Sequence, residues 1–342
     1  MRSKVGSVVT ADSAPLLIIS GPTACGKTKL AIELAHELDA EIVNADSVQV
    51  YRDFDIGSAK PTAEEQSSAP HHLLDVLQPH EQFDVAQYVE LADRCIADIR
   101  ARGKRVIVVG GSTMYLTALL HGLAKMPKSD PSLRKEFDQR DTADLYLELS
   151  KSDPAAAKRL HPNDRQRIER ALQVTRLGAK TLSEQQAQHC VQAVRYAARI
   201  FVMCWPRANL YERINQRTQQ MLASGLIEET RSIVERHGEA CPALSTLGYA
   251  QVIDHLKGEL PTPALESMIA QQTRRFAKRQ LTYWRNEPVK RGWGIEPVQR
   301  QSLLRKHGEL LEFETLRKDI GSLVELVGEG RGPGAKLWYL DG

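Results

Sequence analysis

A glycine-rich stretch near the start of the chain contains the residues best suited to chemistry. It has the pattern G-x-x-x-x-G-K-T and consists of Gly21, Pro22, Thr23, Ala24, Cys25, Gly26, Lys27 and Thr28. In such a loop, backbone N–H groups at the start of a helix bind anionic oxygens, the lysine adds a positive charge, and the threonine hydroxyl contacts a metal ion. The stretch predicts a binding site for a diphosphate or triphosphate with Mg²⁺, in which Thr28 is the metal ligand.

The flanking segments give this loop its structural context. An apolar run at residues 16–19 precedes it, and a run with helical periodicity at residues 30–35 follows it. The order strand, glycine loop, helix distinguishes a phosphate-binding loop from a tight turn that happens to be rich in glycine. The loop predicts the ligand but not the reaction.

A carboxylate follows the next predicted strand. Asp46 comes directly after the apolar segment at residues 41–44 and begins the run D-S-V-Q-V-Y. Ligands of parallel sheets gather at the carboxyl ends of the strands, so Asp46 could bind a metal ion or act as a general base. An aspartate here is equally typical of a turn or a helix cap, and the sequence leaves both interpretations open.

The third apolar strand ends without an acid. Phosphate-loop NTPases usually place an aspartate that supports Mg²⁺ at the end of a strand. Residues 105–109 are instead followed by Gly110, Gly111 and Ser112. This argues against simple ATP hydrolysis, and the glycines would allow a ligand to approach closely.

A basic segment near residue 280 is the best candidate for nucleic-acid binding. At about 100° per residue, the five cations between residues 272 and 285 share one helical face of about 140°. The opposite face is expected to pack on the protein and contains Phe276, Ala277, Gln280, Leu281, Tyr283 and Trp284. A stripe of cations uninterrupted by acids suits contacts with a phosphate backbone, although most charge runs are solvated surfaces.

The order of apolar and periodic segments predicts an α/β fold. Strands at 16–20, 41–44, 105–109 and 196–205 alternate with helices at 27–38, 84–102 and 114–120, and further helices are expected at 210–237 and 268–284. This pattern predicts a P-loop NTPase-like parallel sheet with helices on both faces. Residues 1–120 and 195–287 would form this catalytic core, residues 121–194 an all-helical insertion domain, and residues 288–342 a weakly ordered tail.

Composition indicates an ordinary globular chain. The 342 residues have a formal net charge of +3, which does not by itself indicate nucleic-acid binding. The five cysteines form no C-x-x-C pair, and no apolar stretch approaches the ~20 residues needed to cross a bilayer. We therefore expect a cytoplasmic protein without a membrane partner, and nothing in the sequence demands more than a monomer.

Several of these segments, in this order, resemble the tRNA dimethylallyltransferase (tRNA isopentenyltransferase) family. The resemblance covers residues 16–285. It rests on the glycine-rich loop and on the segments 46–51, 55–61, 70–75, 110–116, 161–172, 221–226, 248–249 and 273–285. The eukaryotic members' C-terminal zinc finger is absent, so the chain is similar to the bacterial type.

The resemblance implies transfer of a dimethylallyl group from dimethylallyl diphosphate to N6 of the adenosine adjacent to the anticodon in certain tRNAs. The phosphate loop would then hold a diphosphate leaving group with Mg²⁺. Asp46 matches the family's general base, and Thr23 matches an active-site threonine. The helical insertion would grip the anticodon stem-loop of the tRNA.

The resemblance also implies a set of tRNA-contacting residues. They are Asp46, Ser47, Val48, Gln49, Ser112, Arg134, Gln166, Arg167, Ile168, Glu169, Arg170, Ser245, Thr246, Leu247, Gly248, Tyr249, Ala250, Lys278, Arg279, Gln280, Leu281, Thr282, Tyr283, Trp284 and Arg285. Ser58 and Ser112 stand where the family usually has threonine, which keeps the hydroxyl. Cys25, where serine is common, is either reactive toward thiol reagents or an inert small residue.

Three other functions fit parts of the sequence. An isopentenyltransferase acting on free adenine nucleotides would need neither the helical insertion nor the basic stripe. A P-loop kinase is disfavoured by the missing acid after residue 109. An RNA-binding module with a vestigial loop is disfavoured by the presence of Lys27, Thr28 and Asp46.

Overall fold

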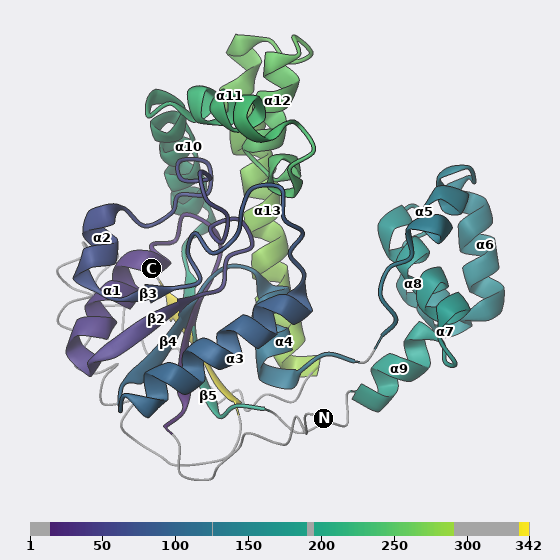
Figure 1. Ribbon diagram of the computed structural model, residues 1–342, viewed down its shortest axis with the longest axis horizontal. Helices are drawn as coiled ribbons and strands as arrows, with labels where there is room; N and C mark the ends of the chain where they lie inside the picture. Colours follow the sequence, from purple (N-terminus) through teal and green to yellow (C-terminus); the bar gives the residue numbers. More distant parts are fainter. Residues whose placement is uncertain (1–13, 125, 190–194, 291–334, 342) are drawn as a thin grey trace. The chain divides into compact units, whose positions relative to one another are not determined.

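The computed structural model of the chain describes residues 14–124, 126–189, 195–290 and 335–341. The chain divides into two compact units, one comprising residues 1–120 with 194–342 and the other residues 121–193. The described part of the first unit is an α/β fold, and that of the second is helical (Figure 1). The predicted fold class, a parallel sheet with helices on both faces plus a helical insertion, is confirmed.

The described residues of the α/β unit form a six-stranded sheet. Its strands are β1 (Leu16–Ser20), β2 (Ala40–Asn44), β3 (His71–His72), β4 (Arg105–Val109), β5 (Ala198–Cys204) and β6 (Ala335–Asp341). They lie in the order β3-β2-β4-β1-β5-β6, and each neighbouring pair is parallel. The loop that leaves β1 therefore emerges near the middle of the sheet, between the ends of β4 and β5.

Helices cover both faces of the sheet because the strand side chains alternate between them. In β1, Ile18 packs with α3 (Val85–Ala101) and α4 (Thr113–His121), whereas Ile19 packs with α1 (Lys27–Leu38). Both isoleucines are fully buried. Burial on both faces explains why these strands are continuous apolar runs in the sequence.

Five more helices belong to this unit: α2 (Ala63–Ser68), α10 (Arg207–Ala223), α11 (Leu226–His237), α12 (Tyr249–Leu256) and α13 (Thr262–Lys290), with a 3₁₀ turn η1 (Pro242–Ser245). The single helix predicted at 210–237 is wrong. The chain breaks between α10 and α11 at Gly225, whose φ of 99° lies in the left-handed region that favours glycine. Helices α11, α12 and α13 share a separate hydrophobic core with Val50 and Phe54 from the loop after β2.

The helical unit contains α5 (Pro131–Asp138), α6 (Thr142–Ser152), α7 (Pro154–Arg159), α8 (Arg165–Leu177) and α9 (Leu182–His189). Two Asp-Pro pairs in the sequence mark helix starts. Asp130 accepts hydrogen bonds from the N–H groups of Ser132 and Leu133, and Asp153 accepts one from that of Ala156. The unit has a hydrophobic core of its own. This core contains Phe137 of α5 and fully buried side chains of α6 and α8.

The C-terminal segment differs in part from the expectation of a weakly ordered tail beginning at residue 288. Helix α13 continues to Lys290, and Ala335–Asp341 form β6, which pairs in parallel with β5. Residues 291–334 and 342 lie outside the described residues. Among the helices that are described, none is long and apolar enough to cross a membrane.

Candidate active site

The glycine-rich loop connects β1 to α1, as its sequence context predicted. Gly21 has a φ of 142°, and a Cβ there would lie 2.7 Å from the carbonyl oxygen of Met203. Gly26 has a φ of 92° and caps the start of α1. The two glycines of the motif are thus required by the loop's close approach to β5 and by its left-handed backbone.

Three side chains hold the carbonyl groups of this loop. Arg213 Nε donates to the carbonyl of Ala24 at 2.8 Å, and Trp205 Nε1 donates to that of Cys25 at 3.0 Å. Lys27 Nζ donates to two further loop carbonyls at 2.8 and 3.2 Å. Because protein donors bind these carbonyl oxygens, the loop is held in one conformation. The side chains of Arg213 and Lys27 also place positive charge beside it, which suits an anionic ligand.

Thr28 is well placed for its predicted contact with a metal ion. Its hydroxyl is half-buried at the start of α1 and makes no hydrogen bond with the described residues. Those residues contain no group of three or more His, Cys, Asp or Glu side chains that could hold a metal by themselves. A Mg²⁺ ion that takes most of its ligands from phosphate oxygens and water, with one hydroxyl from the protein, fits this arrangement.

Cys25 is buried rather than exposed to reagents. The side chain has no exposed surface, packs with Phe201 and Met203, and lies 3.8 Å from Lys27 Nζ. Of the two interpretations of the thiol, the small inert residue fits the structure.

Asp46 forms a turn and also presents an unused oxygen. Its Oδ1 accepts hydrogen bonds from the N–H groups of Val48 at 2.9 Å and Gln49 at 3.3 Å. Oδ2 makes no hydrogen bond with the described residues. Oδ1 forms the turn that one interpretation of the sequence expected, and this turn fixes the carboxylate. Oδ2 is the oxygen that the other interpretation, a metal ligand or general base, would use.

The ends of β2 and β4 meet beside Asp46. Ser112 Oγ accepts a hydrogen bond from the N–H of Ser47 at 3.1 Å, and a Cβ on Gly110 would lie only 2.1 Å from the carbonyl oxygen of Ala45. The glycine after β4 therefore permits close approach of another strand, where the sequence analysis expected a ligand. The serine hydroxyl joins the two strand ends.

Arg217 of α10 is a further candidate for the site that the sequence did not reveal. Burial lowers the pKa of its guanidinium, and the neighbouring charge of Arg213 lowers it further. The Asp46 carboxylate and the Cys25 thiol raise this pKa. The guanidinium thus interacts electrostatically with both the acid after β2 and the phosphate loop. Arg213 and Arg217 are one helical turn apart in the helix that follows β5. This i, i+4 pair of arginines is the sequence feature that could have indicated a role for Arg217.

Helix α13 has the basic face that the sequence predicted. Arg275, Lys278, Arg279 and Arg285 are exposed, and no cation of this face forms an ion pair among the described residues. Arg274 is half-buried instead. It donates to Asn215 Oδ1 at 2.6 Å, so it supports the packing of α13 on α10.

The opposite face of α13 packs on the protein, with one exception. Ala277, Gln280 and Trp284 are buried, but Phe276 is 37% exposed and lies beneath the guanidinium of Arg279. The prediction that Phe276 packs on the protein is wrong. The ring instead extends the exposed cationic face with a flat apolar surface.

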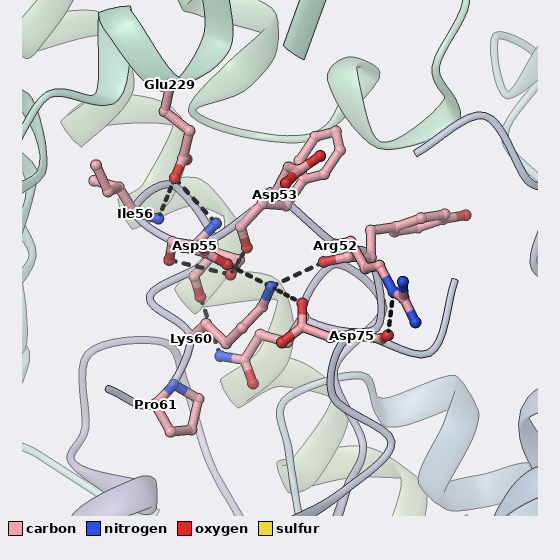
Figure 2. A network of polar contacts seen from close by, with 12 residues as sticks. Arg52, Asp53, Asp55, Ile56, Lys60, Pro61, Asp75 and Glu229 are labelled. Carbon is pink, nitrogen blue, oxygen red and sulfur yellow. Dashed lines mark hydrogen bonds and ion pairs between the residues drawn. The ribbon is translucent and has the colours of Figure 1, made fainter. Parts of the chain in front are cut away.

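A polar network fixes the loop that follows Asp46 (Figure 2). Lys60 Nζ lies 2.5 Å from carboxylate oxygens of both Asp55 and Asp75 and donates to the carbonyl of Tyr51 at 2.9 Å. The lysine side chain is only 3% exposed. The buried ammonium therefore ties together segments on both sides of α2.

Glu229 of α11 organises the same loop from the other side. Its carboxylate accepts hydrogen bonds from three consecutive N–H groups, those of residues 55, 56 and 57, at 3.1, 2.8 and 3.1 Å. It also accepts one from the hydroxyl of Tyr249 at 2.7 Å. Gln49 Nε2 donates to the carbonyls of Ser58 and Ala59, which connects this loop to the turn at Asp46.

Comparison with known proteins shows the family of the chain. A family model described as IPP transferase matches residues 49–287. The chain belongs to the IPP transferase family. The tRNA dimethylallyltransferase of Anaeromyxobacter dehalogenans is 45% identical over 297 residues, which cover 85% of this chain and 98% of that protein. The tRNA dimethylallyltransferase 1 of Trichlorobacter lovleyi is 46% identical over 80% of this chain and 92% of its own length.

Solved structures of the family are also similar. A tRNA isopentenylpyrophosphate transferase from Bacillus halodurans is 36% identical, has a TM-score of 0.60, and matches over 80% of this chain and 88% of its own. A eukaryotic dimethylallyltransferase acting on tRNA is 27% identical, with a TM-score of 0.69 over 79% of this chain and 70% of its own. The family resemblance inferred from the motifs is confirmed.

The predicted tRNA-contacting residues of this IPP transferase differ in exposure. Exposed side chains are those of Ser47, Arg134, Gln166, Arg167, Ser245, Lys278, Arg279, Thr282 and Arg285. Half-buried ones are those of Asp46, Val48, Gln49, Ser112, Glu169, Arg170, Thr246, Leu247, Ala250, Leu281 and Tyr283. Contact with tRNA is untested for either group and stays a prediction.

Five of the residues predicted to contact tRNA are buried in this structure. Gly248 is buried, and so are the side chains of Ile168, Tyr249, Gln280 and Trp284. Ile168 is in the core of the helical unit, and Tyr249 is in the core formed by α11, α12 and α13. A predicted segment includes both faces of a helix, whereas only one face is available to a partner.

Proposed function

We propose that this chain is a tRNA dimethylallyltransferase. It would transfer the dimethylallyl group of dimethylallyl diphosphate to N6 of the adenosine adjacent to the anticodon and release diphosphate. Membership of the IPP transferase family supports this reaction, as do relatives that are named for it and match over most of their length. The tRNA specificity and the position of the adenosine rest on the family resemblance.

The observation that carries the proposal is the edge of the sheet shared by β1, β4 and β2, where Val109 is in register with both Ile19 and Asn44. The phosphate loop leaves β1 and the turn at Asp46 leaves β2 at this same edge. The Asp46 carboxylate and the Cys25 thiol of the loop both oppose the lowering, by burial, of the pKa of Arg217, which supports a place for this cation in the same site. A transfer reaction needs this arrangement, because the leaving group and the acceptor's proton must be handled at adjacent positions.

The chain's own groups account for the movement of charge and proton. As N6 attacks the allylic carbon, the C–O bond to the diphosphate breaks and negative charge grows on the diphosphate. Lys27 and Arg217 would stabilise that charge, and Asp46 Oδ2 would take the proton released from N6. Thr23, at the tip of the loop, would contact the diphosphate or the reacting carbon. Mg²⁺, held by Thr28 and the phosphate oxygens, would supply further charge neutralisation when bound.

The tRNA would bind to surfaces on each unit. On α13, the exposed cations Lys278, Arg279 and Arg285 suit phosphate contacts. In the helical unit, burial and then the charge of Arg134 lower the pKa of Arg170. The like charge of these two guanidinium groups suits a phosphate of the anticodon stem.

The test is transfer by the wild-type chain and its Asp46→Asn variant. Labelled dimethylallyl diphosphate and Mg²⁺ are incubated with unmodified tRNA or with AMP, and label should enter tRNA alone. Label entering AMP but not tRNA would instead establish an enzyme of free adenine nucleotides.

The asparagine variant separates the two oxygens of Asp46. Its amide oxygen can still accept the hydrogen bonds from residues 48 and 49, but it cannot take a proton. We expect kcat to fall by ~10²–10⁴-fold with tRNA affinity unchanged, since general-base catalysis contributes about that much. Wild-type turnover in the variant would exclude Asp46 as the base.

A further inference from the structure

One buried amide connects the phosphate loop, the turn after β4 and helix α13. Gln280 Oε1 accepts a hydrogen bond from the N–H of Thr23 at 2.9 Å, and Nε2 donates to the carbonyl of Gly111 at 2.9 Å. The residue is 5% exposed. Its side chain therefore bridges the phosphate loop and the turn after β4, two loops that also approach each other where Ser20 Oγ donates to the carbonyl of Gly110 at 2.9 Å.

The geometry leaves little tolerance for another side chain. A Cβ on Gly111 would lie 2.5 Å from Gln280 Nε2. Glutamate could accept from Thr23 but could not donate to Gly111. Asparagine is one methylene shorter, and methionine neither donates nor accepts in a comparable way. The glutamine amide supplies both the acceptor and the donor, which none of these three side chains does at this reach.

We propose that Gln280 is a positioning residue for the transfer reaction. It fixes the phosphate loop, which would hold the leaving diphosphate, relative to the turn at Gly111. The next residue of that turn, Ser112, accepts a hydrogen bond from the N–H of Ser47, beside the proposed base Asp46. The inference rests on the proposed function. It also assigns Gln280 a role inside the protein where the sequence analysis expected a tRNA contact.

The spacing matters because group transfer depends steeply on alignment. A displacement of about 1 Å between reacting groups can cost ~10²-fold in rate. Loss of the amide should therefore lower kcat while leaving the exposed cations of α13 in place to bind tRNA. A direct tRNA contact would behave in the opposite way.

The experiment compares the full-length wild type with Gln280→Met, Gln280→Glu and Gly111→Ala. We expect kcat at saturating substrates to fall ~10–100-fold in all three, with the dissociation constant for tRNA within about threefold of wild type. Gln271→Glu is the matched control, because it places a new charge on an exposed position of the same helix. It should keep wild-type kcat.

Hydrogen–deuterium exchange gives a readout that does not depend on transfer. The amide of Thr23 should exchange at least ~10-fold faster in Gln280→Met, and Gln280→Glu, which keeps that acceptor, should retain its protection. If the wild type transfers no dimethylallyl group, the proposed function fails while exchange still tests the contact. Unchanged kcat in folded Gln280→Met, or a loss confined to tRNA affinity, would overturn the inference.

Discussion

Replacing Glu229 by glutamine should destabilise the α/β unit, because it removes hydrogen bonds that hold the loop after Asp46. Each carboxylate oxygen accepts two hydrogen bonds, and Figure 2 shows the pair at one of them. Oε2 accepts from the N–H groups of Asp55 and Ile56, and Oε1 accepts from that of Gly57 and from the hydroxyl of Tyr249. Glutamine keeps one such oxygen and turns an NH₂ group toward the other pair of donors.

The size of the effect follows from those four bonds. The less costly orientation points the NH₂ group at Tyr249, whose hydroxyl can rotate to accept, and leaves the N–H of Gly57 without a partner. An unsatisfied donor costs ~1–3 kcal/mol, and the remaining bonds lose their charge assistance. Because the loop is half-buried, we expect a net loss of about 2–4 kcal/mol, or roughly 5–10 °C in Tm for a unit of this size.

Urea and thermal unfolding of the full-length chain provide the measurement. The matched control is Glu228→Gln, which makes the same substitution at the preceding, exposed residue of α11. A surface change of this kind should stay within about 0.5 kcal/mol of wild type. If Glu229→Gln were equally harmless, the four hydrogen bonds would contribute nothing net, and the loop would need another explanation for its order.

Two further predictions concern alkaline stability and salt. Burial, with the Glu229 carboxylate adding to it, raises the pKa of Tyr249 well above its ordinary value of 10.0. Above pH 10 the unfolded chain would lose that proton while the folded chain keeps it, so stability should fall by about 1.4 kcal/mol per pH unit from this group. Tyr249→Phe should remove that slope in urea unfolding from about pH 9.5 to 11, and an unchanged slope would contradict it. Replacing both Lys278 and Arg279 by alanine should weaken tRNA binding and reduce the slope of log K against log salt by about one per lost phosphate contact. An unchanged slope would make these cations a solvated surface.

The sequence predicted the sheet and its loop because those features are local. Apolar runs of five residues, a glycine motif between a strand and a helix, and Asp-Pro helix starts all depend on neighbours in the chain. The break at Gly225 was missed because the apolar periodicity continues across it. Strand β6 was missed because the sequence around it is rich in glycine and the preceding pattern is weak.

The contacts that assemble the site could not be predicted in the same way. Gln280 is 257 residues from Thr23, and Glu229 is 172 residues from Gly57. A lone glutamine in a basic helix, or a lone glutamate in an amphipathic one, looks like surface until the tertiary structure places it. Arg217 is similar: its type suggests a charge partner, but only the parallel pairing of β5 with β1 puts α10 beside the phosphate loop.

The acid that is missing after β4 has a structural explanation. No side chain fits at Gly110, because a Cβ there would overlap the carbonyl of Ala45, so this position cannot carry the aspartate that many phosphate-loop proteins use. The next residue of β2's loop, Asp46, provides a carboxylate instead, and its turn directs one oxygen to the backbone while the other stays unused. In the proposed function Asp46, on the strand next to β4 and one strand further from the phosphate loop, would take the proton of the acceptor. The close contact between β2 and β4 explains why no acid stands at Gly110.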